Sequence, residues 1–157
     1  MSQVPIDLQG LLKRQATERY RAVLVTGPAG CGKSDYAKKL ANALSARYLD
    51  LLNEFIDDGE LSSKIDTFDQ QKLLDLLKLK AQGEKTIILD NPDFLINTWG
   101  DRSRREFCEW LGKLDSVQFP TVLCVFAQDD EAFSGISYTP TSADSSRIIP
   151  FQDLQAI

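Results

Sequence analysis

The chain has 157 residues, 43% of them hydrophobic, a length that suits one globular domain with a proper core. It contains no histidine, and its three cysteines (Cys31, Cys108 and Cys124) lack metal-ligand spacing, so neither a zinc site nor a Ser-His-Asp triad is expected. The net charge of −5 is a poor match for DNA phosphates, which leaves DNA contact to an assembly or a local basic patch.

The first third of the chain predicts a helix, two strands and a glycine-rich turn. Spaced apolar residues favour an N-terminal helix within 1–20, and the short β-branched run at 22–26 favours a buried strand. A second helix is expected over 34–46, a second strand over 47–55 and a loop over 56–63.

Strands and helices continue to alternate along the rest of the chain. Thr67 followed by Gln70 fits a capping box that opens a helix, with Gly83 as its C-terminal cap. Asp101 can cap a later helix over 103–114. The remaining strands are expected at 85–90, 120–128 and 147–151, with a polar loop at 134–146.

This alternation predicts an α/β protein with three layers, in which helices cover both faces of a five-stranded, mainly parallel sheet. We expect a single domain over 1–157, with the N-terminal helix at 1–20, the core at 21–151 and a tail at 152–157. No apolar run approaches the ~20 residues of a membrane helix, and the N-terminus has no signal-peptide pattern. A cytoplasmic protein is therefore expected.

The segment GPAGCGKS matches the phosphate-binding pattern G-x-x-x-x-G-K-[ST] in full, between a predicted strand and a predicted helix. Glycines let successive N–H groups point at an anion, and the helix N-terminus adds its dipole. Lys33 would reach the β- and γ-phosphates of ATP, and Ser34 would bind Mg²⁺. The residues expected to bind the nucleotide are Gly27, Pro28, Ala29, Gly30, Cys31, Gly32, Lys33 and Ser34.

Asp90 ends the predicted strand at 85–90, where a P-loop enzyme needs a carboxylate for the Mg²⁺ shell. Many P-loop ATPases place Glu directly after this Asp, as the base that activates water, whereas here the next residue is Asn91. Asn can orient a water molecule but cannot accept its proton. Either Asp93 substitutes as the base, or the protein hydrolyses ATP slowly or binds it without turnover.

Gln128 ends the predicted strand at 120–128. If this strand lies between the strands that carry Gly27 and Asp90, Gln128 would lie near the γ-phosphate and could sense it. Otherwise it is an ordinary polar residue at a strand end.

Residues 20–151 resemble the core of AAA+ P-loop ATPases, on the strength of the phosphate loop, Asp90 and Gln128. The stretch SSRIIPF is also similar to the Ser-Arg element of clamp-loader-type members, whose Arg reaches the nucleotide of a neighbouring subunit. The resemblance implies a homo-oligomer with Arg147 as the arginine finger; the alternative is a surface or ion-paired Arg. The helical lid of typical AAA+ proteins has no counterpart here.

Size, architecture and the Asp-Asn pair also resemble the group of small P-loop proteins in BREX phage-defence systems known as BrxF. That resemblance implies a bacterial ATPase with ATP and Mg²⁺ as cofactors, working beside other defence-system proteins. A basic cluster formed by Arg102, Arg104 and Arg105 favours a solvated face paired with Glu106 or Glu109. An interface, DNA backbone contact or a second finger are its alternatives.

The leading prediction is therefore an ATP-binding, Mg²⁺-dependent, ATP-hydrolysing AAA+-like subunit that oligomerises within a phage-defence system. Catalytic roles fall to Lys33, Asp90, Asn91, Gln128 and Arg147, and Mg²⁺ binding to Ser34 and Asp90. Two alternatives stay open. One is a nucleotide-gated interaction module with little hydrolysis. The other is a small P-loop kinase, because the same loop fits G-x-x-G-x-G-K-S.

Overall fold

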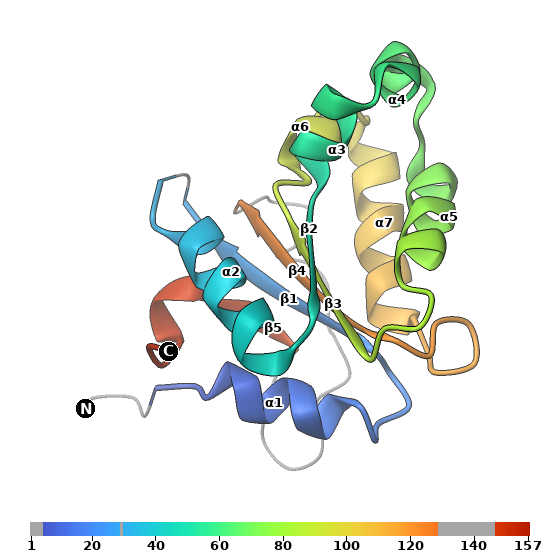
Figure 1. Ribbon diagram of the computed structural model, residues 1–157. Helices are drawn as coiled ribbons and strands as arrows, with labels where there is room; N and C mark the ends of the chain where they lie inside the picture. Colours follow the sequence, from blue (N-terminus) through green and yellow to red (C-terminus); the bar gives the residue numbers. More distant parts are fainter. Residues whose placement is uncertain (1–4, 29, 129–146) are drawn as a thin grey trace.

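Five strands form one wholly parallel sheet in the computed structural model of the chain (Figure 1). The model describes residues 5–28, 30–128 and 147–157, so Ala29 and the predicted polar loop at 134–146 lie outside the described residues. The strand order is β2-β3-β4-β1-β5. The strands are β1 (Ala22–Gly27), β2 (Arg47–Asp50), β3 (Thr86–Asp90), β4 (Val122–Gln128) and β5 (Ile148–Pro150). The predicted α/β, P-loop type of fold is confirmed.

Helices cover both faces of the sheet and one of its ends (Figure 1). One face carries α1 (Leu8–Gln15) and α2 (Lys33–Leu44), and the other carries α5 (Gln70–Lys80) and α7 (Asp101–Lys113). The short helices α3 (Leu51–Asp57), α4 (Gly59–Ser63) and α6 (Asp93–Ile96) lie at the end where strands β2 and β3 finish. None of the described helices is long and apolar enough to cross a bilayer.

Alternating side chains divide the core into two clusters, one on each face of the sheet. In β3, Ile88 belongs to the cluster under α1 and α2, whereas Ile87 and Leu89 belong to the cluster under α5 and α7. Because successive side chains of a strand point to opposite faces, Asp90 follows Ile88 onto the α2 face. The same alternation in β4 places Phe126 under α2 and leads to Gln128 on that face.

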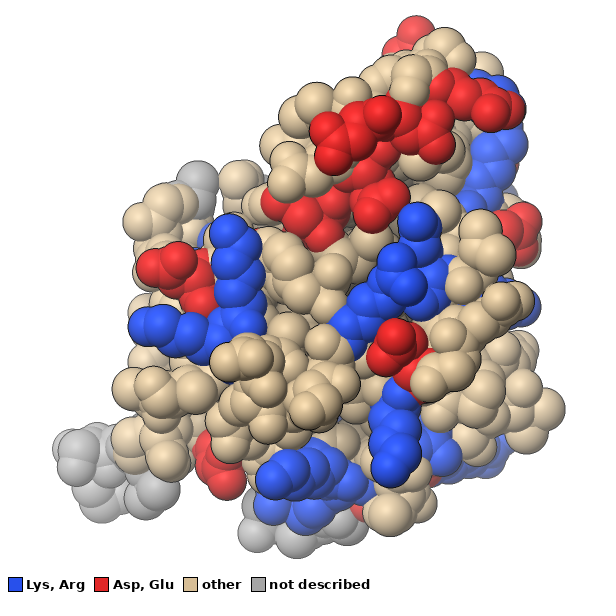
Figure 2. Space-filling model, in the orientation of Figure 1, with Lys and Arg blue, Asp and Glu red and all other residues tan. Residues whose placement is uncertain are grey.

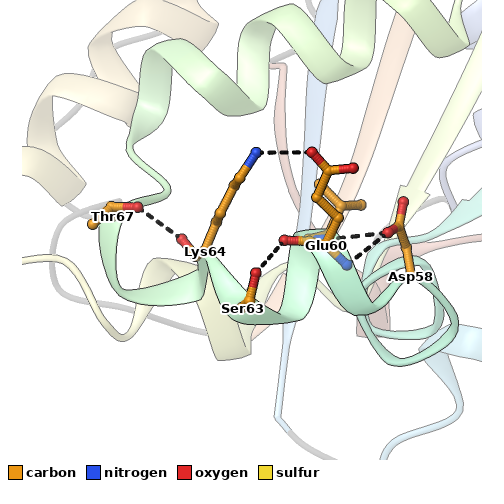
Figure 3. Close-up of polar contacts among 6 residues, drawn as sticks. Asp58, Glu60, Ser63, Lys64 and Thr67 are labelled. Carbon is orange, nitrogen blue, oxygen red and sulfur yellow. Dashed lines mark hydrogen bonds and ion pairs between the residues drawn. The ribbon is translucent and has the colours of Figure 1, made fainter.

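The second predicted strand is shorter than expected, because Asp50 caps a helix. The Asp50 carboxylate accepts a hydrogen bond from the Asn53 N–H at 3.2 Å, and α3 begins there. The predicted loop at 56–63 is also wrong, since it contains α4. In Figure 3 the Asp58 carboxylate caps α4 by accepting from the Glu60 N–H at 3.0 Å. An ion pair between Lys64 and Glu60, 3.1 Å long, spans the end of this helix.

The predicted caps of the later helices shift by one or two residues. Asp69, rather than Thr67, caps α5, by accepting from the Lys72 N–H at 2.9 Å. This helix ends at Lys80, and Gly83 lies in the turn beyond it with φ of +78°. The helix α7 starts at Asp101 itself, and α6 was not predicted.

Candidate nucleotide-binding site

The loop after β1, the ends of β3 and β4 and the start of α2 surround one cavity of about 350 Å³, a size that suits a small ligand. Strand β4 lies between β1 and β3, so the strand that ends at Gln128 lies between the strands that carry Gly27 and Asp90, as its expected position near the γ-phosphate requires. The predicted residues Lys33, Ser34, Asp90 and Asn91 reach the same cavity. Its lining is Gly30, Gly32, Lys33, Ser34, Asp35, Asp90, Asn91, Asp93, Phe126 and Gln128.

The phosphate loop has the backbone that an anion cradle needs. Gly30 and Gly32 have φ of +75° and +97°, in the left-handed region that favours glycine. Gly32 is also the N-cap of α2, so no side chain there competes for the first N–H groups of the helix. Four other described helices are capped by carboxylates, those of Asp7, Asp50, Asp58 and Asp69, whereas α6 and α7, like α2, have no side-chain cap. The start of α2 therefore offers its N–H groups and its dipole to a phosphate.

Lys33 lies folded into the loop, with only 9% of its surface exposed. Its Nζ donates hydrogen bonds to the carbonyl oxygens of Gly27 at 2.9 Å and Pro28 at 2.6 Å, and lies 3.6 Å from Cys31 Sγ. The ammonium is thus held beside the N–H groups of the cradle. A phosphate at the loop would take over one or more of these bonds.

Asp90 is the buried carboxylate of the site, 1% exposed, and two donors hold it. Its Oδ1 accepts from the Asn91 N–H at 3.0 Å, and its Oδ2 accepts from the Tyr48 hydroxyl at 2.6 Å. Sequence reasoning missed Tyr48, because the bond depends on the register between β2 and β3.

The donor set fits Mg²⁺ shared with phosphates. Asp90 supplies a carboxylate and Ser34 a hydroxyl to the same cavity. No group of three or more acidic, Cys or His side chains among the described residues could hold a metal alone. Mg²⁺ suits such a site, because it keeps several waters and binds through one or two protein groups together with substrate phosphates.

Asn91 has φ of +55°, in the left-handed region. Asn adopts this conformation more readily than Glu, because its short side chain bonds locally. The turn between β3 and α6 therefore gives a structural reason for Asn where many ATPases have Glu. The side chain still lines the cavity.

Asp93, two residues beyond Asn91, also lines the cavity. Its Oδ1 accepts from the Gln128 N–H at 2.8 Å, which ties the start of α6 to the end of β4. Burial raises the pKa of Asp93; the Gln128 bond and the nearby Lys33 oppose this shift, and nearby Asp90 adds to it. A carboxylate with a raised pKa is a better proton acceptor near neutral pH.

Arg147 does not line this cavity, and its expected role as an arginine finger toward a neighbouring subunit stays a prediction. The side chain is 1% exposed, and its guanidinium donates to the carbonyl oxygens of Ala22 and Gly112, each at 2.8 Å. Ala22 begins β1, about 17 Å of strand away from Gly27 where the phosphate loop starts. Within the chain, this buried guanidinium therefore joins the start of β1 to α7, at the opposite end of the strand from the phosphate loop.

The basic cluster at the start of α7 is paired in part as the sequence favoured, through Arg102 and Glu106. Arg102 Nε lies 3.1 Å from a Glu106 carboxylate oxygen, and Arg104 pairs with Asp101. The Arg102 side chain is 93% exposed. An exposed pair such as Arg102–Glu106 contributes little to stability, whereas the Arg104 side chain is only 25% exposed.

Comparison with known proteins gives a match over part of the chain. No family model matches the chain. Similar proteins include two named "Putative adenylate kinase", from Saccharolobus islandicus (strain L.S.2.15 / Lassen #1) and Saccharolobus solfataricus (strain ATCC 35092 / DSM 1617 / JCM 11322 / P2). Each is 37% identical over 65 residues, which is 41% of this chain and 34% of the relative. The match spans about a third of the length of these relatives. With the fold and the cavity, it supports a P-loop nucleotide-binding protein.

Proposed function

We propose that this protein binds ATP with Mg²⁺ and hydrolyses it, as an AAA+-like P-loop ATPase. The observation that carries the proposal is the convergence of the phosphate loop, two strand ends and one helix start on a single cavity. The phosphate loop, Asp90, Asp93 and Gln128 all line it. A phosphate cradle, a metal-binding carboxylate and a second carboxylate are the parts that hydrolysis of a phosphoanhydride requires.

Each residue has a distinct role in the proposed reaction. Lys33 and the N–H groups at the start of α2 hold the β- and γ-phosphates, and Ser34 with Asp90 holds Mg²⁺. Bound Mg²⁺ neutralises charge on these phosphates. Asp93 accepts a proton from a water whose oxygen bonds to the γ-phosphorus, while the bond from that phosphorus to the β–γ bridging oxygen breaks and ADP leaves. Gln128 orients this water or contacts the γ-phosphate.

A small phosphotransferase is the second candidate, because the relatives are named as adenylate kinases. The described lining of the cavity favours hydrolysis over transfer. Lys33 is the one cation among these lining residues, against the carboxylates of Asp35, Asp90 and Asp93. A second phosphorylated substrate would meet net negative charge there and would need further cations to bind.

The cellular setting in this proposal comes from the sequence resemblance. It is a cytoplasmic homo-oligomer that works with other proteins of a phage-defence system. Acidic side chains gather over α3 and α4, at the top of Figure 2, which disfavours DNA phosphates at that end of the molecule. If the protein binds ATP without hydrolysing it, the alternative function is a nucleotide-gated interaction module.

Phosphate release from Mg²⁺-ATP, measured with and without AMP as an acceptor, tests the proposal. The Asp93→Asn variant should lose about 100-fold or more in turnover and keep its ATP affinity, because it loses only the proton acceptor. Asp35→Asn, which removes another carboxylate of the same cavity, is the matched control and should stay near wild type. Wild-type turnover in Asp93→Asn would contradict the assigned base. ADP formed from AMP faster than phosphate is released would favour the kinase, and ATP binding with no release would favour the interaction module.

A further inference from the structure

We propose that Tyr48 is a positioning residue for the magnesium ligand Asp90, an inference that rests on the proposed function. The Tyr48 hydroxyl donates a 2.6 Å hydrogen bond to Asp90 Oδ2. Asp90 lines the cavity and Tyr48 does not, so Tyr48 would act on the metal through Asp90 alone. Outer partners of this kind orient a metal ligand and tune its affinity.

The register of the sheet brings the two side chains together. Tyr48 in β2 pairs with Ile88 in β3, and Asp90 lies two residues further along β3 on the same face. The tyrosine side chain is long enough to bridge this diagonal and place its hydroxyl against the carboxylate. An edge strand that supplies no lining residue thereby reaches the site.

Two contacts hold the Tyr48 ring in place. It packs against the apolar cluster between α2 and the sheet, and the Lys38 ammonium lies 5.9 Å from the ring centroid, within cation–π range. The donor therefore has a defined position before any ligand binds, which keeps the entropic cost of orienting Asp90 low.

The bond completes the support of the carboxylate. Asp90 Oδ1 is held by the Asn91 N–H and Oδ2 by Tyr48, so rotation of the carboxylate is restrained at both oxygens. Each oxygen keeps a second lone pair for a cation. The phenol hydroxyl of tyrosine is a neutral donor at neutral pH.

Tyr48→Phe removes the hydroxyl and keeps the ring, so the packing against α2 should survive. Loss of an outer partner typically weakens metal binding by 10- to 100-fold. We expect the Mg²⁺ concentration for half-maximal enhancement of nucleotide binding to rise about tenfold. Nucleotide affinity in EDTA should stay unchanged, because Lys33 and the phosphate loop are untouched.

The test is a Mg²⁺ titration of the binding of a fluorescent ATP analogue, with Tyr36→Phe as the matched control. Tyr36 lies on the same face of the sheet, and its hydroxyl donates to the Gln155 carbonyl at 2.8 Å, away from Asp90. The inference predicts a shifted Mg²⁺ midpoint in Tyr48→Phe alone. A merely structural role would instead weaken binding equally with and without Mg²⁺.

The outcomes distinguish failure of the Tyr48 role from failure of the proposed function. An unshifted midpoint in Tyr48→Phe, with normal Mg²⁺-dependent binding by the wild type, overturns the role of Tyr48 and leaves the proposed function standing. Absence of nucleotide binding by the wild type overturns both. If Tyr48→Phe is less stable, the rise in melting temperature that ATP causes can be measured in Mg²⁺ and in EDTA on the variant itself. The inference predicts a smaller rise than in the wild type with Mg²⁺ and the same rise in EDTA.

Discussion

Arg147→Met tests whether the buried arginine stabilises the fold or serves the nucleotide site. The substitution keeps an unbranched apolar side chain and removes the guanidinium. In the structure this group joins β5 to the start of β1 and to the last turn of α7, through the Ala22 and Gly112 carbonyls. It also lies over the Tyr20 ring, with Cζ 5.1 Å from the ring centroid.

The expected loss of stability is about 3 kcal/mol. A hydrogen bond from a charged donor contributes about 1.5–3 kcal/mol, and a partly desolvated cation–π contact about 1–2 kcal/mol. Relief from burying a guanidinium, a cost of several kcal/mol, offsets part of this sum. The hydrogen-bond values already include the cost of leaving the Ala22 and Gly112 carbonyls without this donor. For a chain of this size, 3 kcal/mol lowers the melting temperature by about 6–12 °C.

Thermal and urea unfolding measure this effect, with Arg102→Met as the matched control. The Arg102 side chain is 93% exposed and makes an ion pair on the helix surface, so its loss should cost under about 0.5 kcal/mol. The reasoning would be refuted if Arg147→Met kept wild-type stability. An accompanying loss of ATP turnover confined to an assembled form would then support the arginine-finger role.

Three more predictions concern the turn after β3 and the phosphate loop. Turnover should rise with pH as Asp93 loses its proton. The free energy of unfolding in urea should fall over the same range, as the pH rises above 3.8, the ordinary pKa of Asp. The reason is that the folded state holds this proton more tightly than the unfolded state. Asp93→Asn should abolish both trends. Asn91→Val should cost about 1–2 kcal/mol in urea unfolding, because a β-branched residue is strained at φ of +55°, whereas Asn91→Gly should be near neutral. Gly32→Ala should weaken ATP binding in calorimetry, since φ of +97° disfavours alanine at the cradle; unchanged affinity would show that the loop relaxes without loss.

The parts of the site that are local in sequence were predictable. The phosphate loop depends on adjacent glycines, Lys33 and Ser34, and it lies between a strand and a helix as its pattern requires. The positions of Asp90 and Gln128 could be predicted because each is a polar residue at the end of an apolar strand. The position of β4 between β1 and β3 then brings both to one cavity.

The parts that depend on long-range contacts were not predictable from one sequence. The bond from Tyr48 to Asp90 requires the register of β2 against β3, and Arg147 is buried because β5 and α7 meet at the far end of β1. The extent of β2 was misjudged for a local reason. Its apolar pattern continues into α3, and the Asp50 cap decides the boundary.

Calorimetric titration with Mg²⁺-ATP of the wild type, Lys33→Ala and Lys39→Ala tests the central claim, that this cavity binds nucleotide, most directly. Lys39 is exposed on α2 and serves as the control for loss of one positive charge. The wild type and Lys39→Ala should bind about one ATP per chain, and Lys33→Ala should bind at least about tenfold more weakly, because it loses charged hydrogen bonds to the phosphates. No saturable binding by the wild type, or equal affinity in Lys33→Ala, would contradict the account.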